Sequence, residues 1–275
     1  MEKKIAVQID HFGIFSKIPK TEEVFFRLGF VAAGGKSTLT PDSNGELPSC
    51  LHFVMDNGYM EYMRTWPEDF ERCNRSDGGI VYFEFAMQNA HKAHDSVKDA
   101  GFACTDVVHA VRYADHGKKK GEAIFECIAL NDDILPNTMI GGVDHQTREL
   151  FYHNDRYLHR NGAYRIEEIC LCAETDSAFD SQAESISLYE AQLGSFEPDS
   201  CIRRLSLLDR KSMAERFHTE LPDDLTNASA VIFKTNEWEE IQNFVQKSGY
   251  AYQIDQTRCT VDLIKELKTI IVFEK

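Results

Sequence analysis

The chain has 275 residues, of which 43% are hydrophobic and 27% charged, and its formal net charge is −15. This composition is typical of a folded globular protein that is large enough to bury a sizeable core. The acidic excess argues against a nucleic-acid backbone or an anionic membrane as the partner, since both require a basic surface.

The predicted elements repeat four times along the chain, each time as a strand followed by a helix that ends at a glycine. In three units the strand begins 20 residues before its glycine (9 to 29, 81 to 101 and 229 to 249), whereas the third unit is longer (167 to 194). The predicted strands are 9–15, 81–87, 167–173 and 229–235. A repeated unit of this kind decides the architecture before any single residue is interpreted.

Each predicted helix has apolar residues at helical spacing, such as Val24, Phe25 and Leu28 in the first unit. Each glycine can take the left-handed conformation that ends a helix. Gly29, Gly101 and Gly249 are followed at once by an aromatic residue, and Gly194 is followed by Phe196. We expect this aromatic residue to fold back on the last helical turn.

Further β-like runs follow each glycine. They cover residues 51–55 and 59–65, then 105–113, 123–130 and 139–145, then 202–208, and finally 260–264 and 269–273. Asn57-Gly58 is a strong signal for a hairpin turn between the first two runs. Each unit therefore approximates a βαβββ module, the third being the least regular, and the polar segment 154–164 is the predicted linker between two pairs of modules.

Three polar residues in these strands are candidates for chemistry. His11 lies in an otherwise apolar run, where it is either a half-buried, hydrogen-bonded histidine or a metal ligand or general base. Glu61 lies among large apolar residues, and a carboxylate is costly to bury there without a cation or a donor, although an exposed strand face is the alternative. Glu84 shares strand parity with Tyr82 and is either an additional acid or the partner of an arginine.

Several motifs, in this order, give the chain a family resemblance. They are Ile9-Asp10-His11, Phe26-Arg27-Leu28-Gly29-Phe30, Asp56-Asn57-Gly58-Tyr59-Met60-Glu61-Tyr62, His145-Gln146-Thr147-Arg148-Glu149-Leu150 and His159-Arg160-Asn161-Gly162-Ala163. This organisation resembles the vicinal oxygen chelate superfamily, the glyoxalase-like proteins. The resemblance implies an α+β fold in which four βαβββ modules pair into two cupped mixed sheets. The expected domains are residues 1–153, which carry the candidate site, a linker at 154–164, and a degenerate module pair at 165–275.

The resemblance also implies a metal site. Metal-dependent members carry ligands on the first and last strand of each paired module, which correspond here to His11, Glu61 and the neighbourhood of Asp144, with His145 beside it. Tyr82 replaces the usual histidine, so an extradiol dioxygenase is disfavoured. The implied cofactor is a divalent metal such as Zn, Ni, Mn or Fe. The matching positions of the second half are Glu168 and Ser229, which form no metal set and indicate scaffold or a lid.

Two functions follow from the resemblance. The first is a metal-dependent lyase or isomerase acting on a small carbonyl or vicinal-oxygen compound, with Glu61 as the proton-transferring carboxylate. Tyr82, Glu84, Phe53, Tyr59 and His145 are then the expected substrate-binding residues. The second is a non-catalytic protein that holds a small molecule by apolar and aromatic contact, through Phe15, Phe53, Tyr59, Tyr82 and Phe85.

The cellular setting is predicted from the N-terminus and the cysteines. The apolar run after the first residues is too short, and is interrupted too early by polar residues, to be a signal peptide. The eight cysteines form no CxxC pair. We therefore expect a cytoplasmic protein with reduced thiols, present as a monomer or a homodimer.

Overall fold

The computed structural model describes the chain except residues 40–45, 47, 65–77, 132–133, 136, 174–177, 195–200, 223–224 and 226. Its elements, in chain order, are β1 (Glu2–Ser16), α1 (Glu23–Arg27), a 3-10 turn (Ala33–Gly35), β2 (Cys50–Met55), β3 (Gly58–Met63), β4 (Gly78–Ala86), α2 (Ala90–Asp99), β5 (Val108–Asp115), β6 (Lys120–Ala129), β7 (Met139–His145), a second 3-10 turn (Arg148–Leu150), β8 (Ala163–Cys172), α3 (Phe179–Glu190), β9 (Ile202–Leu208), α4 (Arg210–Phe217), β10 (Ser229–Thr235), α5 (Trp238–Ser248), β11 (Ala251–Ile254), β12 (Arg258–Leu263), α6 (Ile264–Leu267) and β13 (Thr269–Glu274). Within these described ranges, no helix is long and apolar enough to cross a membrane.

The predicted helix-ending glycines have the expected backbone. Gly29, Gly101, Gly194 and Gly249 have φ values of 83°, 91°, 81° and 84°, all in the left-handed region that glycine adopts at little cost. Phe196, the aromatic residue expected to follow the third stop, lies outside the described residues. The repeated strand–helix unit read from the sequence is therefore confirmed.

The α+β class is confirmed, but the modules are unequal. The second (β4-α2-β5-β6-β7) and the fourth (β10-α5-β11-β12-β13) have the full βαβββ pattern. Among the described residues, the first module has two strands after its helix and the third has only β9. Helix α4 and strand β11 were not predicted, because their short segments lack a clear apolar period.

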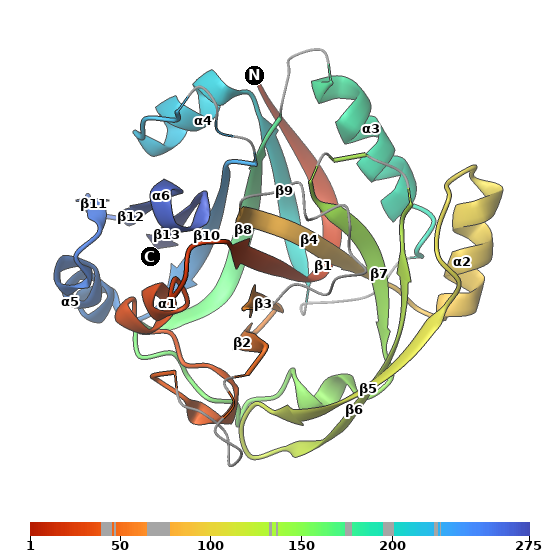
Figure 1. Cartoon of the computed structure of the whole chain (residues 1–275), viewed down its shortest axis with the longest axis horizontal. Helices are drawn as coiled ribbons and strands as arrows, with labels where there is room; N and C mark the ends of the chain where they lie inside the picture. Colours follow the sequence, from red (N-terminus) through yellow and green to blue (C-terminus); the bar gives the residue numbers. More distant parts are fainter. Residues whose placement is uncertain are drawn as a thin grey trace.

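One continuous sheet contains both halves (Figure 1). The N-terminal half has the order β2-β3-β1-β4-β7-β6-β5, and the C-terminal half has the order β9-β8-β10-β13-β12-β11. Strand β1 is long enough to serve both halves. Its first part pairs with β9, and its second part pairs with β3 on the same edge. The segment predicted as a linker, 154–164, follows the second 3-10 turn and includes the first two residues of β8.

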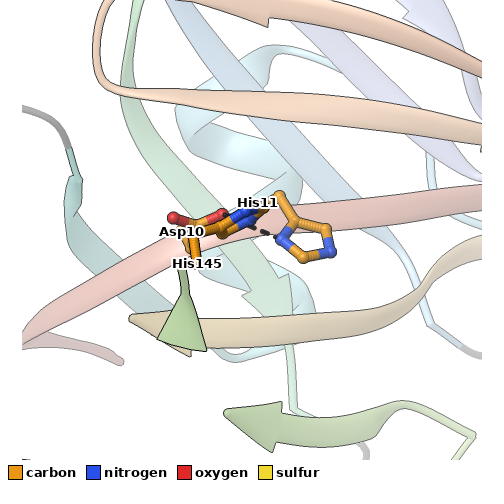
Figure 2. Close-up of side chains that lie close together, drawn as sticks. All are labelled: Asp10, His11 and His145. Atoms are coloured by element: carbon orange, nitrogen blue, oxygen red, sulfur yellow. Dashed lines mark hydrogen bonds and ion pairs between the residues drawn. The ribbon is translucent and has the colours of Figure 1, made fainter. Parts of the chain in front are cut away.

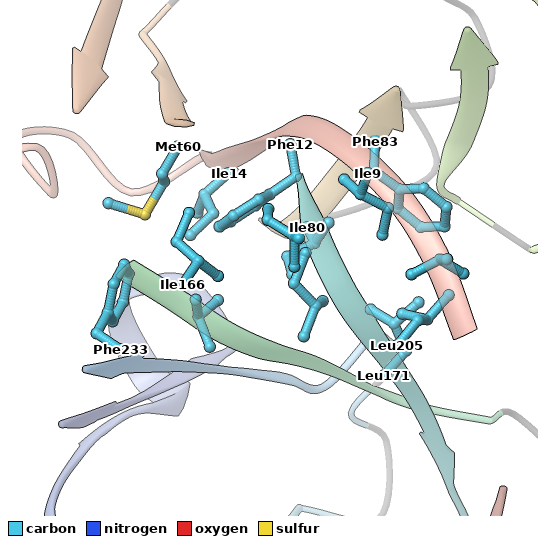
Figure 3. Close-up of a cluster of buried hydrophobic side chains, with 14 of the residues drawn as sticks. Ile9, Phe12, Ile14, Met60, Ile80, Phe83, Ile166, Leu171, Leu205 and Phe233 are labelled. Carbon is cyan, nitrogen blue, oxygen red and sulfur yellow. The ribbon is translucent and has the colours of Figure 1, made fainter. Parts of the chain in front are cut away.

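The main core lies between the two halves of the sheet. Phe12 and Ile14 of β1 lie opposite Ile166 and Leu171 of β8 (Figure 3). The apolar faces of α1, α2, α3 and α5 join the same buried cluster, as their helical spacing predicted. Because alternate strand residues point to opposite faces, the other face of the sheet in each half is left free to form a cup.

In the C-terminal half, helix α4 fills this second face. Met213 and Phe217 pack against Ile232 and Val272 of the sheet. Arg216 holds Glu168, the counterpart of His11, through an Nη2–Oε2 contact of 2.7 Å, and Ser206 Oγ donates to the same carboxylate at 2.6 Å. The arginine and the serine satisfy the buried carboxylate, so this half has the contacts of a scaffold.

Removing the cation from this pair should destabilise the protein. In Arg216→Met the buried Glu168 carboxylate loses its partner, and the expected cost is about 3 kcal/mol of unfolding free energy. Urea unfolding followed by circular dichroism measures the change. The double variant Glu168→Gln/Arg216→Met should recover most of the loss, and a double variant as unstable as the single one would contradict the assignment.

Candidate active site

A β-bulge in β1 creates the polar site of the N-terminal cup. The apolar residues Ile5, Val7 and Ile9 face the core, and after the bulge Phe12 and Ile14 do so. On the neighbouring strand β4, the register moves from Phe85 opposite Ile9 to Glu84 opposite His11, so that Asp10 is the extra residue. Such an insertion re-aims side chains and is frequent beside active sites.

Asp10 is fully buried and lies at the centre of a polar network (Figure 2). Its Oδ1 lies 3.1 Å from His11 Nδ1 and 3.2 Å from His145 Nε2, and Tyr152 donates its hydroxyl to it at 3.2 Å. Arg148 donates to Oδ2. Burial opposes the charge of Asp10, but His145, His11 and Arg148 outweigh it and hold the pKa of Asp10 well below its usual range.

The network orients the His11 imidazole. With Nδ1 directed at Asp10, the other nitrogen, Nε2, lies 3.8 Å from Glu84 Oε2, and the ring stacks on Tyr59 at 4.2 Å. A carboxylate on one imidazole nitrogen is the arrangement that orients a metal-binding histidine. Burial lowers the pKa of His11, but the Asp10 hydrogen bond and the charges of Glu84 and Glu61 raise it above the ordinary value.

Glu61 is buried but well compensated. His52 Nε2 lies 2.9 Å from its Oε1, Tyr82 donates its hydroxyl to Oε2, and Cys50 Sγ lies 3.5 Å from Oε2. Burial alone would raise the pKa of Glu61, but His52, His11 and the Tyr82 hydroxyl lower it by a larger amount. The pKa of Glu61 is therefore shifted strongly downward. The Tyr82 ring lies over Gly13, where any side chain would collide with it.

Glu84 has the opposite environment. Among the described residues its polar contacts are His11 Nε2 and the Cys127 thiol, both at 3.8 Å. Burial raises the pKa of Glu84 above the ordinary value, and the charge of Glu61 adds to this effect while His11 opposes it. The cup therefore holds two carboxylates that stay ionised, Asp10 and Glu61, and a third, Glu84, that is poised to accept or donate a proton.

Most residues expected at the site share the cup face. Glu61, Tyr82, Glu84, Tyr59 and His145 each contact His11 or a residue that does.

Three of the residues expected at the site lie elsewhere. Phe53 packs against Phe25 and Phe30 on the core face, with ring centroids 5.1 and 5.8 Å apart. Asp144 precedes His145 on β7, so it points to the opposite face of the strand and is not brought to His11. Phe85, expected in an aromatic binding cup, contacts Tyr189 on the core side. Strand alternation explains all three differences.

Five side chains of the site were not identified from the sequence. They are Asp10, Cys50, His52, His116 and Arg148. One signal was available, because the one-residue break in the apolar alternation of β1 indicates a bulge at Asp10. The predicted Asn57-Gly58 turn gave the hairpin but not its register. The two-residue turn is Asp56-Asn57, with Met55 paired to Gly58, and this register places His52 opposite Glu61. His116 and Arg148 come from loops with no local signal.

Within the described part of the chain, two groups of side chains have ligand atoms close enough to share a metal ion. One is Asp10, His11 and His145, and the other is Cys50, His52 and Glu61, with ligand atoms within 4.8 Å of one another in each group. In the first group Asp10 already bonds to Arg148. His11 Nε2, by contrast, faces the incompletely compensated Glu84, as a cation site requires.

The His11 environment predicts a measurable titration. In the metal-free protein the His11 pKa should exceed about 6.5, the ordinary value. A raised folded-state pKa means that the stabilisation from the charged ring is complete below the unfolded-state value and is lost as the pH rises through the folded-state value. NMR titration of the imidazole measures this pKa.

The control is Glu84→Gln, which removes a nearby negative charge and should lower the His11 pKa. An unchanged pKa in this variant would show that Glu84 does not act on the ring.

No protein-family model matches the chain, and no curated protein sequence matches it. Solved structures do resemble it. A xylose isomerase-like TIM barrel/4-hydroxyphenylpyruvate dioxygenase fusion protein superposes with a TM-score of 0.55 at 9% identity, over 99% of this chain and 50% of that one. The Mn(II)-bound glyoxalase from Novosphingobium aromaticivorans gives 0.55 at 12% identity, over 99% and 83%. A hypothetical protein from Staphylococcus aureus gives 0.52 at 9% identity, over 97% and 98%.

These similarities establish the fold, and the identities are too low to transfer a substrate. The chain spans only half of the fusion protein, so the activity of that whole protein is not carried over. The resemblance inferred from the sequence motifs is supported by the structural neighbours, which include a glyoxalase and a dioxygenase fusion. The chain has the α+β fold of the glyoxalase-like proteins of the vicinal oxygen chelate superfamily.

Proposed function

We propose that the N-terminal cup is the active site of a metal-dependent lyase or isomerase that moves a proton in a small carbonyl or vicinal-oxygen compound. The observation that supports this proposal is the pairing of a buried carboxylate, Glu61, with a half-buried one, Glu84, whose pKa values are shifted in opposite directions beside an oriented histidine. Two titratable groups whose environments separate their pKa values are the usual basis of acid–base catalysis.

The donor set suits a divalent cation. His11 Nε2 and the Glu61 carboxylate would hold it, and they offer the nitrogen and oxygen ligands that Mn, Fe, Ni and Zn accept. When bound, the cation would polarise the oxygen atoms of the substrate and stabilise negative charge developing on them. Asp10 would keep the His11 ring oriented, and Tyr82 would fix Glu61 through its hydroxyl. The Mn(II)-bound glyoxalase among the structural neighbours is consistent with such a centre.

The two carboxylates would divide the chemistry between them. Glu61 is the residue that the sequence suggested for proton transfer, but its low pKa makes it a weak base. Glu84 has a raised pKa and long polar contacts, so it is better suited to take a proton from one carbon of the substrate and return it to the next. We therefore assign proton transfer to Glu84 and ligand binding to Glu61.

Metal binding can be tested without a substrate. Manganese titration followed by electron paramagnetic resonance should show one tight site in the wild-type protein and a loss of affinity of at least tenfold in His11→Ala. His91→Ala is the matched control, because His91 is 74% exposed on α2 and should not alter binding. Equal manganese affinity in the wild type and His11→Ala would exclude His11 as a ligand.

The reaction class can be tested by isotope exchange. The metal-loaded protein would be incubated in D2O with a panel of α-hydroxycarbonyl compounds and glutathione hemithioacetals, and deuterium incorporation would be followed by NMR. For any compound that exchanges, Glu84→Gln should lower the rate about 10²- to 10⁴-fold, the usual contribution of a general base. Exchange that is unaffected by Glu84→Gln would refute the role of Glu84.

A second candidate is a small-molecule-binding protein without catalysis. The observation that favours it is Tyr82, which takes the position of an expected ligand and uses its hydroxyl to bind Glu61. The stacked His11, Tyr59 and Phe151 rings would form the aromatic wall of such a site. Saturable binding of a panel compound with no deuterium exchange in any of them would support this function over the first.

A further inference from the structure

A second group of ligand-type side chains lies on the β2–β3 hairpin. His52 Nε2 is 2.9 Å from Glu61 Oε1, Cys50 Sγ is 3.5 Å from Glu61 Oε2, and the ligand atoms of the three residues lie within 4.8 Å of one another. A tetrahedral zinc site, with Zn–N and Zn–O bonds of about 2.0–2.1 Å and Zn–S bonds of about 2.3 Å, places its ligand atoms roughly 3.3–3.6 Å apart. The hairpin therefore presents its donors at spacings close to those that zinc requires.

The backbone fixes this arrangement. In the antiparallel β2–β3 ladder His52 lies directly opposite Glu61, and Cys50 is two residues before His52 on the same face. The two-residue turn at Asp56-Asn57 holds the register, and the Asn57 side-chain amide donates to the carbonyl oxygen of Ile166 on β8 at 2.7 Å. The three donors thus lie on a rigid element, which a precise metal site needs.

His116 supplies a fourth donor next to this group. Its ring centroid is 5.6 Å from that of His52, the residue is only 3% exposed, and its Nε2 has no hydrogen-bond partner among the described residues. Its backbone carbonyl accepts from Tyr157 at 2.9 Å, and the bridge between Gly117 and Arg156 holds the same turn. A buried imidazole nitrogen without a partner is costly unless something binds it.

We propose that Cys50, His52, Glu61 and His116 form a zinc-binding site, separate from the His11 centre and linked to it through Glu61. The sulfur ligand selects zinc over manganese, magnesium or calcium, which prefer oxygen. On binding, the Cys50 thiol forms a Zn–S bond and releases its proton to solvent, while His116 and His52 bind as neutral imidazoles. Burial and the charge of neighbouring His52 lower the pKa of His116 to about 3, so this ring is already neutral.

The inference does not depend on the proposed enzyme activity. Cys50, His52 and His116 have no part in the proton transfer assigned to Glu84, and only Glu61 belongs to both sites. Two sites in one cup predict different preferences, with an oxygen- and nitrogen-preferring cation at His11 and a thiolate-preferring cation at Cys50.

Cobalt(II) is the probe that distinguishes the sites, because only a cysteine-bound ion gives a thiolate-to-cobalt charge-transfer band in the near ultraviolet. Titration of metal-stripped full-length protein should produce this band together with visible bands of tetrahedral cobalt, and added zinc should remove both. Cys50→Ser should abolish the charge-transfer band, and His116→Ala should weaken cobalt binding at least tenfold. Cys172→Ser is the matched control, since Cys172 is also half-buried and also contacts a backbone carbonyl through its thiol.

Further variants separate this proposal from the proposed function. His11→Ala should lose tight manganese binding and keep the thiolate-to-cobalt band. Cys50→Ser should lose the thiolate-to-cobalt band and keep tight manganese binding. The melting temperatures of the metal-free variants would show whether each one is folded, and His52→Gln replaces Cys50→Ser if the latter does not fold. The proposal is overturned if the wild-type protein gives no thiolate band, or if the band survives Cys50→Ser.

Discussion

One extra residue in β1 is the constraint on which the site depends. Asp10 is inserted between the part of the strand that pairs with β9 and the part that pairs with β3. In a strand of the same sequence without the bulge, strict alternation through Asp10 would place His11 on the same face as the core residues Ile5, Val7 and Ile9. The bulge turns both Asp10 and His11 to the cup side, where the carboxylate and the imidazole are in contact.

Burying this much charge is possible because nearly every group is compensated by a specific neighbour. Asp10 is neutralised by Arg148 from the loop after β7. Glu61 is satisfied by His52 from the adjacent strand β2 and by Tyr82 from β4, which lies beyond β1. Glu84 is the exception, with long contacts and a raised pKa. A group left less satisfied than its neighbours marks the place where a cation, a substrate or a proton is handled.

The two halves of the sheet show two ways to use the same cup. In the C-terminal half, α4 covers the sheet with Met213 and Phe217, and Arg216 saturates the carboxylate at the position equivalent to His11. In the N-terminal half the equivalent face carries histidines, carboxylates and a thiol. The first arrangement buries apolar area and stabilises the fold, whereas the second gathers the titratable and ligand-type side chains on which the proposed function rests.

The sequence by itself determined the strand–helix periodicity, the glycine helix ends and the α+β class, because these follow from local backbone preferences and apolar spacing. It also pointed to His11, Glu61, Tyr82 and Glu84, since a polar side chain in an apolar strand is conspicuous. It misplaced Phe53 and Asp144, whose faces depend on register and pleat. Only the tertiary structure brought Arg148 to Asp10, His52 to Glu61 and His116 to His52, because these contacts join loops and strands that are far apart along the chain or fixed by pairing. The shift of each pKa, and hence the division of roles between Glu61 and Glu84, comes from burial and neighbouring charge, which have no signature in a single sequence.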